Sequence, residues 1–322
     1  MKVLVTGGTG FVGTHLVNRL LHRGHQVAVL ARDPRKTVNR YNRPVEAAAG
    51  NVLDRDSLTA AAAGRDAVIH LVGIIHETKD QTFDRIHREA TENAIAAASS
   101  AGVGRYLHMS AMGASEDSPS EYSRTKAAGE KAVRVSRLRW TIFRPSIVFG
   151  VGDGFVSLLA PIVRRNPGFI PVIGPGTTRF QPVAIEDVAR VYADALEKPE
   201  TAGKTYEVGG PEVFTLDQIY REIAAAVGKP GKPLIHFPLW YGRLLASAFE
   251  RFFAHPPLTR DQLKSLQRDN AADVSATVAD FPGEWKRFRP GIRAYLSNGR
   301  HDPRSGIGED VELERRSVLR IR

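Results

Sequence analysis

The chain has 322 residues, 42% of them hydrophobic and 25% charged, which is ordinary for a globular protein with one large or two small domains. It has no cysteine and no apolar run of the roughly 18 residues that a membrane-spanning helix needs, so disulfides, thiolate metal sites and a spanning helix are excluded. The net charge of +10 would suit nucleic-acid binding, but half of the excess lies in residues 286–322, which hold ten basic and five acidic residues.

Up to Gly150 the chain alternates short apolar runs with helical patterns. This alternation is typical of βαβ units around a parallel sheet. The strands that we expect are 2–5, 26–30, 45–49, 67–72, 105–109 and 140–148. The helices that we expect are 15–21, one that begins at Asp56, 83–100 and 122–135. We therefore predict an α/β fold with a Rossmann-type, doubly wound parallel sheet over residues 1–150.

After Gly150 the regular alternation ends. The Pro- and Gly-rich stretch 167–176 is predicted as a loop. Further on we expect a strand at 180–185, a helix at 187–196, a strand at 204–208 and a helix at 215–227 that opens with a capping box. Residues 183–209 are expected to return to the Rossmann domain. Residues 151–182 and 210–300 are expected to form a smaller C-terminal α/β substrate lobe.

Residues 239–253 form an aromatic stretch in which Leu245, Phe249 and Phe253 would share one helical face. Such stripes usually pack into a core, and packing on the substrate lobe is the interpretation that we favour. The alternative is a surface that contacts a membrane, a lipid-like substrate or a protein partner.

The last residues, 301–322, are rich in Gly, Pro and Arg and poor in apolar residues. This composition predicts a basic, disordered tail. An acidic partner, a membrane surface or RNA could bind it, but a solvated tail is the simpler interpretation and nucleic-acid binding is not expected. Because the first strand begins at residue 2, no room is left for a cleaved signal sequence, and we expect a cytoplasmic protein.

A glycine-rich turn follows the first strand, where the sequence reads TGGTGFVG. Gly7, Gly10 and Gly13 have the spacing GxxGxxG, and a helix follows. In this context backbone N–H groups of the turn and of the first helical residues, here Phe11 and Val12, can approach a pyrophosphate. These five residues are predicted to bind a dinucleotide.

The end of the second strand indicates which dinucleotide. An acidic residue there would hold the ribose 2′-hydroxyl of NAD, but this chain has Ala31 followed by Arg32. A guanidinium favours the 2′-phosphate of NADP(H) over NAD(H). Asp33 is one position late for the ribose and could instead pair with Arg35.

Three further residues are expected to border the cofactor. Asp54, after the third strand, is placed to face the adenine. Val72 and Gly73, at the end of the fourth strand, would lie along the adenosine half. Each of the three could also be a plain loop residue.

A Tyr-x-x-x-Lys pair, Tyr122 and Lys126, places a phenol and an ammonium on one helical face. The ammonium should lower the pKa of the phenol and make Tyr122 a credible acid/base, and Lys126 can also bind the nicotinamide ribose. Ser110 directly follows a strand, where its hydroxyl could polarise a substrate carbonyl. Pro145 and Ser146 end the next strand, where the nicotinamide would lie.

The histidines are assigned no role in this centre. His70 and His108 lie within apolar strands and are expected to be satisfied core residues. His76 and His87 could face the substrate crevice, but neither is selected. No spacing of His, Asp and Glu suggests a metal site.

In combination these motifs resemble the extended short-chain dehydrogenases/reductases of the NAD-dependent epimerase/dehydratase family. More narrowly, several stretches resemble the atypical subgroup that includes the NADPH-binding accessory subunit of respiratory complex I and its bacterial relatives. These stretches are 108–114, 123–131, 179–183, 203–212 and 258–262. Two departures argue against a sugar-nucleotide substrate: Ile86-His87-Arg88 stands where epimerases carry an asparagine, and the segment from Ser110 to Tyr122 is short.

The resemblance implies an NADP(H)-binding oxidoreductase or epimerase that uses Ser110, Tyr122 and Lys126 on the carbonyl or hydroxyl group of a small-molecule substrate. It also implies an alternative, a non-catalytic NADPH-binding accessory or assembly subunit of a membrane-associated respiratory complex, although the intact Ser110, Tyr122 and Lys126 favour the enzyme. In that case the protein would be peripheral at the inner face of the membrane, and residues 239–253 with the basic tail would contact the partner.

Overall fold

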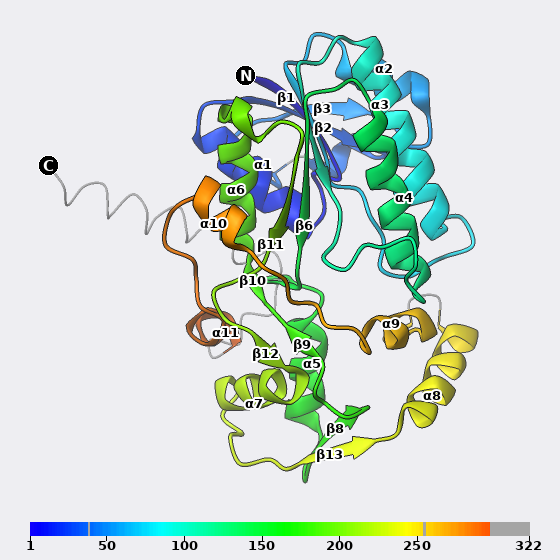
Figure 1. The fold of residues 1–322 in the computed structure, drawn as a ribbon, viewed down its shortest axis with the longest axis vertical. Helices are drawn as coiled ribbons and strands as arrows, with labels where there is room; N and C mark the ends of the chain where they lie inside the picture. Colours follow the sequence, from blue (N-terminus) through cyan, green and yellow to red (C-terminus); the bar gives the residue numbers. More distant parts are fainter. Residues whose placement is uncertain (38, 254–255, 297–322) are drawn as a thin grey trace, which may run out of the picture.

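The computed structural model describes residues 1–37, 39–253 and 256–296, so the tail predicted for residues 301–322 lies outside the described part of the chain. Figure 1 shows a parallel sheet between two layers of helices in the upper part of the view. Short strands and helices from the second half of the chain lie below it.

Seven strands form the central sheet, and every neighbouring pair is parallel. In spatial order they are β11 (Lys204–Val208), β6 (Trp140–Pro145), β5 (Arg105–Met109), β4 (Ala67–His70), β1 (Lys2–Thr6), β2 (Gln26–Ala31) and β3 (Glu46–Ala49). The strand order reverses at β1, and ligands of such sheets bind at the carboxyl ends beside this point. The predicted Rossmann-type doubly wound sheet is confirmed.

Helices cover both faces of the sheet (Figure 1). On one face, α1 (Phe11–His22) packs against α6 (Ile185–Glu197). On the other face lie α2 (Arg55–Ala62), α3 (Ala90–Ser100) and α4 (Glu121–Val135). The central strands β1, β2 and β4 are buried from both sides, and their sequences are therefore apolar along almost their whole length rather than alternating. The edge strand β3 is mostly exposed.

The helix expected over 83–100 is divided in the structure. Its first part is a π-helix, η2 (Asp84–Glu89), and α3 continues from Ala90. Short π-helical segments inside α-helices are rare and often lie at functional sites. The Rossmann part also contains two 3₁₀ turns, η1 (Pro34–Thr37) and η3 (Pro199–Thr201).

The smaller part has its own apolar core, in which side chains of three helices meet. Its elements are β7 (Val148–Phe149), α5 (Val156–Arg165), β8 (Ile170–Ile173), β9 (Arg179–Phe180), β10 (Val183–Ala184), β12 (Phe214–Thr215), α7 (Leu216–Ala226), β13 (Leu234–Phe237) and α11 (Phe288–Leu296). Three two-stranded sheets join β10 to β7, β12 to β9 and β13 to β8.

Three helices connect the two parts. In Figure 1, α8 (Leu239–Phe252) extends beside the smaller part, and α9 (Arg260–Ser265) then lies below the end of α4. The chain returns upward to α10 (Ser275–Asp280), which contacts β11.

The predictions for residues 151–185 were partly wrong. The expected loop 167–176 contains β8, which pairs with β13, and the expected strand 180–185 is two short strands, β9 and β10. Helix α5 was not predicted. It carries Pro161 in its interior, which obscures the helical signal, yet Val156, Ala160 and Val163 are fully buried and hold it in place.

Candidate active site

The glycine-rich turn connects β1 to α1 at the point where the strand order reverses. Gly7 has φ +75°, a left-handed conformation that glycine adopts without strain, and the N–H of Gly10 donates to the carbonyl of Gly7 at 3.0 Å. A Cβ on Gly13 would lie 2.2 Å from the Gly7 oxygen. Only glycine therefore fits where the helix begins against the strand.

The start of α1 suits an anion. Its N-cap residue, Gly10, has no side chain to satisfy the first helical N–H groups, and the first turn contains no acidic residue. Those N–H groups, among them the ones of Phe11 and Val12, can therefore bind a phosphate. Val72 borders the turn, since a Cβ on Gly7 would be 3.1 Å from its backbone nitrogen. The residues present fit the pyrophosphate of a dinucleotide.

Arg32 follows β2 and is exposed, and its guanidinium has no hydrogen-bond or ion-pair partner in the part of the chain that the structure describes. Asp33 receives two side-chain hydrogen bonds from Arg35, at 2.9 and 3.1 Å, as the alternative reading of the sequence expected. Sequence reasoning missed Arg40, whose guanidinium donates to Thr14 of α1 at 3.2 Å. A second cation therefore lies beside the helix that starts the cofactor site.

Asp54 is the N-cap of α2. Its carboxylate accepts the N–H groups of Asp56 at 3.1 Å and Ser57 at 3.4 Å. The expected helix beginning at Asp56 in fact begins one residue earlier, at Arg55. One oxygen of the side chain selected for the adenine is thus used to cap a helix.

Lys126 is buried and points toward the carboxyl ends of β4 and β5. Its Nζ donates to the carbonyl of Met109 at 3.0 Å and lies 3.0 Å from the position that a Cβ on Gly73 would occupy. Burial lowers the pKa of Lys126 to about 8, and the carboxylate of Glu130 partly offsets this effect. The structure therefore brings Lys126 and Gly73 together.

Tyr122 lies one helical turn before Lys126, at the first turn of α4. Its ring stands edge-on to His87, with 5.2 Å between the ring centroids, and edge-on to Phe83 at 5.9 Å. Burial raises the pKa of Tyr122 to about 12. The expected lowering of this pKa by Lys126 was wrong, because the cost of burying a phenolate dominates and the ammonium is directed to Met109.

Ser110 follows β5 and is 2% exposed. Its hydroxyl has no hydrogen-bond partner among the residues that the structure describes. Nearby, Arg144 of β6 binds Glu130 of α4 with two hydrogen bonds of 2.7 Å. Burial raises the pKa of the Glu130 carboxyl, but the hydrogen bonds and charge of Arg144 and the hydrogen bond from Arg134 outweigh it, and the pKa is lowered. This network fixes α4 to the sheet behind the Tyr122–Lys126 face.

Pro145 and Ser146 lie at the end of β6 and are both buried. The Pro145 carbonyl accepts the N–H of Met112 at 2.9 Å. The Ser146 hydroxyl donates to Asn270 Oδ1 at 2.5 Å, and Asn270 Nδ2 donates to the Met112 carbonyl at 3.2 Å. Asn270, which sequence reasoning missed, therefore joins the loops after β5 and β6 from a segment that follows α9.

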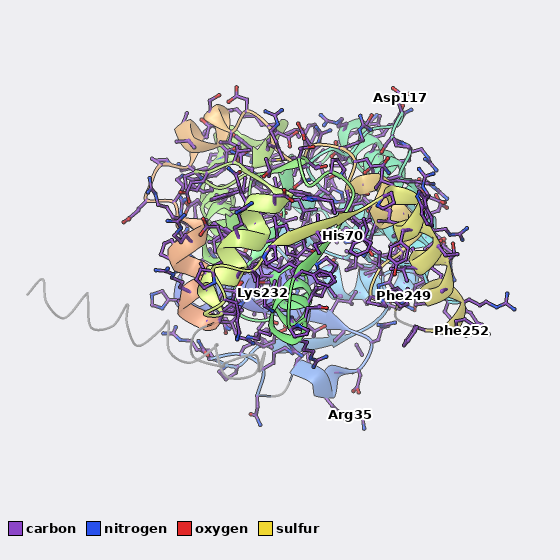
Figure 2. All side chains as sticks on the ribbon, turned by 90° about the horizontal axis from the view of Figure 1, so that it is seen from below. Arg35, His70, Asp117, Lys232, Phe249 and Phe252 are labelled. Atoms are coloured by element: carbon purple, nitrogen blue, oxygen red, sulfur yellow. The ribbon has the colours of Figure 1, made fainter. Side chains whose placement is uncertain are left out.

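Three buried histidines lie beside Lys126, and the charge of Lys126 lowers the pKa of each further than burial alone does. His70 stacks on His108 with 5.7 Å between centroids, and its Nδ1 is 2.8 Å from Thr6 Oγ1. Figure 2 shows His70 within the body of the molecule. Both ring nitrogens of His108 lack a hydrogen-bond partner among the residues described, so only His70 is satisfied as expected.

His87 is the functional candidate that the sequence did not single out. Its ring contacts Tyr122, and its Nε2 lies 3.6 Å from the position of a Gly73 Cβ, next to Lys126. In the sequence, His87 is distinguished only by lying in the helix that precedes the Tyr-x-x-x-Lys segment. No periodic pattern in that helix identifies it as a functional residue.

The aromatic stretch 239–253 forms α8, in which only Gly242 and Ala246 are buried. Trp240 is 66% exposed, Leu244 62% and Phe252 76%. Of the stripe that was expected to pack, Leu245 and Phe249 are half-buried, whereas Phe253 is 55% exposed, so the expectation was wrong for Phe253. In Figure 2, Phe252 projects outward from α8 at the edge of the molecule.

Across residues 1–37, 39–253 and 256–296, no helix is long and apolar enough to cross a membrane. In the same residues no group of three or more His, Cys, Asp or Glu side chains could hold a metal ion.

Residues 3–209 match the family model described as "NAD dependent epimerase/dehydratase family". The chain is 34% identical over 288 residues to NADH dehydrogenase [ubiquinone] 1 alpha subcomplex subunit 9, mitochondrial, of Arabidopsis thaliana, a match that covers 86% of this chain and 70% of that protein. It is also 34% identical over 239 residues to the ceramide reductase of Caulobacter vibrioides, covering 73% of each.

Among solved structures, the fold is similar to that of the Thermus thermophilus UDP-glucose 4-epimerase complex with NAD. The TM-score is 0.70 with 22% sequence identity, and the similarity covers 95% of this chain and 100% of that one.

Proposed function

The chain belongs to the NAD dependent epimerase/dehydratase family, a group of extended short-chain dehydrogenases/reductases, and on that basis we propose that it is an NADP(H)-dependent oxidoreductase acting on a carbonyl substrate. Nicotinamide dinucleotide binding follows from family membership. The preference for NADP(H) and the centre formed by Ser110, Tyr122 and Lys126 are our proposal. The observation that carries it is the position of Tyr122 and Lys126 on one side of α4, with Lys126 Nζ next to Gly73 at the sheet edge.

The glycine turn and the first N–H groups of α1 would hold the pyrophosphate. Arg32 would bind the 2′-phosphate, because its guanidinium is exposed and Asp33 is engaged by Arg35. Arg40, held beside α1 through Thr14, supplies a second positive charge in the same region. This set of residues supports NADP(H) over NAD(H).

When bound, NADPH supplies a hydride. Tyr122 is a neutral phenol at working pH, since its pKa is raised to about 12, and it would donate a proton to the carbonyl oxygen as the hydride adds to the carbon. Lys126 lies one turn further on α4, where its ammonium would stabilise the tyrosinate and bind the nicotinamide ribose.

Cofactor preference is tested by fluorescence titration with NADPH and NADH. We expect Arg32→Ala to weaken NADPH binding by about tenfold or more while NADH changes by less than about twofold, because a charge-assisted pair to the phosphate is lost. Arg221→Ala is the matched control, since Arg221 is exposed on α7 of the smaller part, away from the proposed site. Tighter binding of NADH than of NADPH by the natural protein would refute the assignment.

Turnover is tested by following NADPH consumption with a panel of carbonyl and quinone-like compounds. Tyr122→Phe should abolish consumption and leave NADPH affinity unchanged. Tyr220→Phe, a change of the same kind in α7 of the smaller part, should leave both unchanged. If Tyr122→Phe still consumes NADPH, Tyr122 is not the proton donor of the reaction.

A second candidate function is supported by α8. One face of α8 packs on β8 and α9, while the face with Trp240, Leu244 and Phe252 is exposed, and the Arabidopsis relative is named as a subunit of NADH dehydrogenase. In this alternative the protein is an NADPH-binding accessory subunit, peripheral at the inner face of the membrane, and α8 contacts the complex.

The two candidates predict different results. An accessory subunit would bind NADPH without consuming it, equally in the natural protein and in Tyr122→Phe. It would also co-migrate with complex I of its own cells on native gels, and Trp240→Ser with Phe252→Ser would abolish co-migration. Co-migration that the double variant retains would count against a role for α8.

A further inference from the structure

His87 makes contacts that connect the loop after β4 to α4. The side chain is 1% exposed. Its Nδ1 lies 2.9 Å from Thr125 Oγ1, and its Nε2 lies 3.1 Å from the backbone nitrogen of Ile74. On the third side its ring meets Tyr122 edge-on. The imidazole thus touches residues adjacent to both Gly73 and Lys126.

Both ring nitrogens of His87 are satisfied in either neutral tautomer. With the proton on Nδ1, the ring donates to the Thr125 hydroxyl and Nε2 accepts the Ile74 N–H. With the proton on Nε2, the ring donates to the Ile74 carbonyl, 3.1 Å away, and Nδ1 accepts the Thr125 hydroxyl. Burial and the Lys126 charge lower the pKa of His87 to about 2, so the ring stays neutral and bound to the Ile74 backbone in both forms.

The atoms beside Nε2 belong to the proposed centre. The position of a Cβ on Gly73 is 3.6 Å from His87 Nε2 and 3.0 Å from Lys126 Nζ. A single hydrogen bond to Ile74 therefore sets the path of the backbone at Gly73, and that backbone borders the space in front of the Lys126 ammonium.

The backbone around His87 packs closely against α4. His87 lies in the π-helical turn η2, and its carbonyl accepts the Thr91 hydroxyl at 2.7 Å. A Cβ on Gly129 of α4 would lie 2.5 Å from the same oxygen, so glycine is needed for α4 to pack against this turn. Contacts of the His87 carbonyl and contacts of its ring together fix the position of the imidazole.

We infer that His87 is a positioning residue for the nicotinamide half of the cofactor: through Thr125 and the Ile74 backbone it holds the Gly73 backbone in register with Lys126. This inference rests on the proposed function only in assuming that the dinucleotide lies along the sheet edge with its nicotinamide ribose at Lys126. It does not require turnover.

The test compares two ligands in the full-length protein: NADPH, and adenosine 2′,5′-bisphosphate, which lacks the nicotinamide nucleotide. His87→Phe keeps an aromatic ring against Phe83 and Tyr122 but leaves the half-buried Ile74 backbone without its imidazole partner. We expect NADPH to bind about tenfold more weakly and the bisphosphate to bind within about twofold of the natural protein. His87→Gln, whose amide oxygen can accept the Ile74 N–H, should recover most of the NADPH affinity.

Thr125→Val provides a second test, because it removes the hydroxyl that contacts Nδ1 of His87. It should weaken NADPH alone, and its effect should not add to that of His87→Phe, because both variants break one connected network. Unchanged NADPH binding in His87→Phe, or equal weakening of both ligands, would overturn the inference. A natural protein that binds NADPH normally but never consumes it would overturn only the proposed reaction, whereas one that binds neither ligand would overturn both.

Discussion

The carboxylate of Asp261 accepts the backbone N–H of Tyr122 at 3.2 Å. The same carboxylate accepts the N–H of Glu121 at 2.8 Å and the hydroxyl of Ser120 at 2.7 Å. Asp261 belongs to α9, whereas the other three residues begin α4. The helix that carries the proposed reaction centre therefore receives its anionic cap from a distant segment.

Replacing this cap should destabilise the protein. We expect Asp261→Ala to lower the free energy of unfolding by about 1–2 kcal/mol, since three donors at a positively polarised helix end lose their acceptor. Urea unfolding followed by circular dichroism measures the change. Asp117→Ala is the control, because Asp117 projects from an exposed loop (Figure 2), and it should change stability by less than about 0.5 kcal/mol. Equal effects of the two changes would contradict the cap.

The lowered pKa of Lys126 predicts a specific pH dependence. Its folded-state pKa of about 8 lies below its ordinary 10.5, so between these values the unfolded state binds a proton that the folded state lacks. This group therefore makes the unfolding free energy rise as pH increases from 8 to 10.5. In Lys126→Met the rise should be smaller by up to about 3 kcal/mol. Unfolding at several pH values measures it, with the exposed Lys131→Met as a control that should follow the natural protein.

The Glu130–Arg144 pair predicts a large loss. Glu130→Gln would remove the bidentate partner of the half-buried Arg144 guanidinium, which keeps its ion pair with Glu207, and we expect a cost of about 1.5–3 kcal/mol in unfolding free energy. Because the folded pKa of Glu130 lies below its ordinary 4.5, its contribution is present above that value and is lost as pH falls through the folded pKa. The exposed Glu116→Gln should cost less than about 1 kcal/mol.

The glycine turn can be tested by adding one methyl group. In Gly13→Ala the new Cβ would lie 2.2 Å from the Gly7 oxygen and 2.6 Å from the Gly8 Cα, so the turn must shift. We expect NADPH affinity to fall by at least about tenfold and stability to fall by about 1–3 kcal/mol. Gly154→Ala, where no atom lies within 4 Å of the new Cβ, should leave binding unchanged. Normal NADPH binding by Gly13→Ala would show that the cofactor does not bind at the glycine turn.

Local patterns in the sequence were enough to predict the sheet. Buried parallel strands are continuously apolar, and the turn from Gly7 to Gly13 has a spacing that follows from backbone geometry. The same reasoning failed where tertiary contacts decide. Strand β8 forms within a Pro- and Gly-rich stretch because β13, more than sixty residues later, pairs with it.

In the candidate site, too, the residues with a local sequence pattern were predicted and those placed by tertiary contacts were not. Tyr122 and Lys126 were found because their spacing is local, but Asn270 and Asp261 reach the site from 124 to 158 residues away, and no spacing in the sequence encodes such contacts. The pKa of Tyr122 was predicted in the wrong direction because burial cannot be read from an i, i+4 pair. His87 was passed over because its partners, Thr125 and Ile74, lie on two other elements.

The cap on α4 also has a consequence for synthesis. Asp261 follows Tyr122 by 139 residues, and the ribosome delivers the chain from its amino end. The glycine turn and all of α4 therefore leave the ribosome long before the carboxylate that caps the helix does. A nascent chain can form the phosphate-binding half of the site early, but the end of α4 that carries Tyr122 is completed only after α9 has been translated.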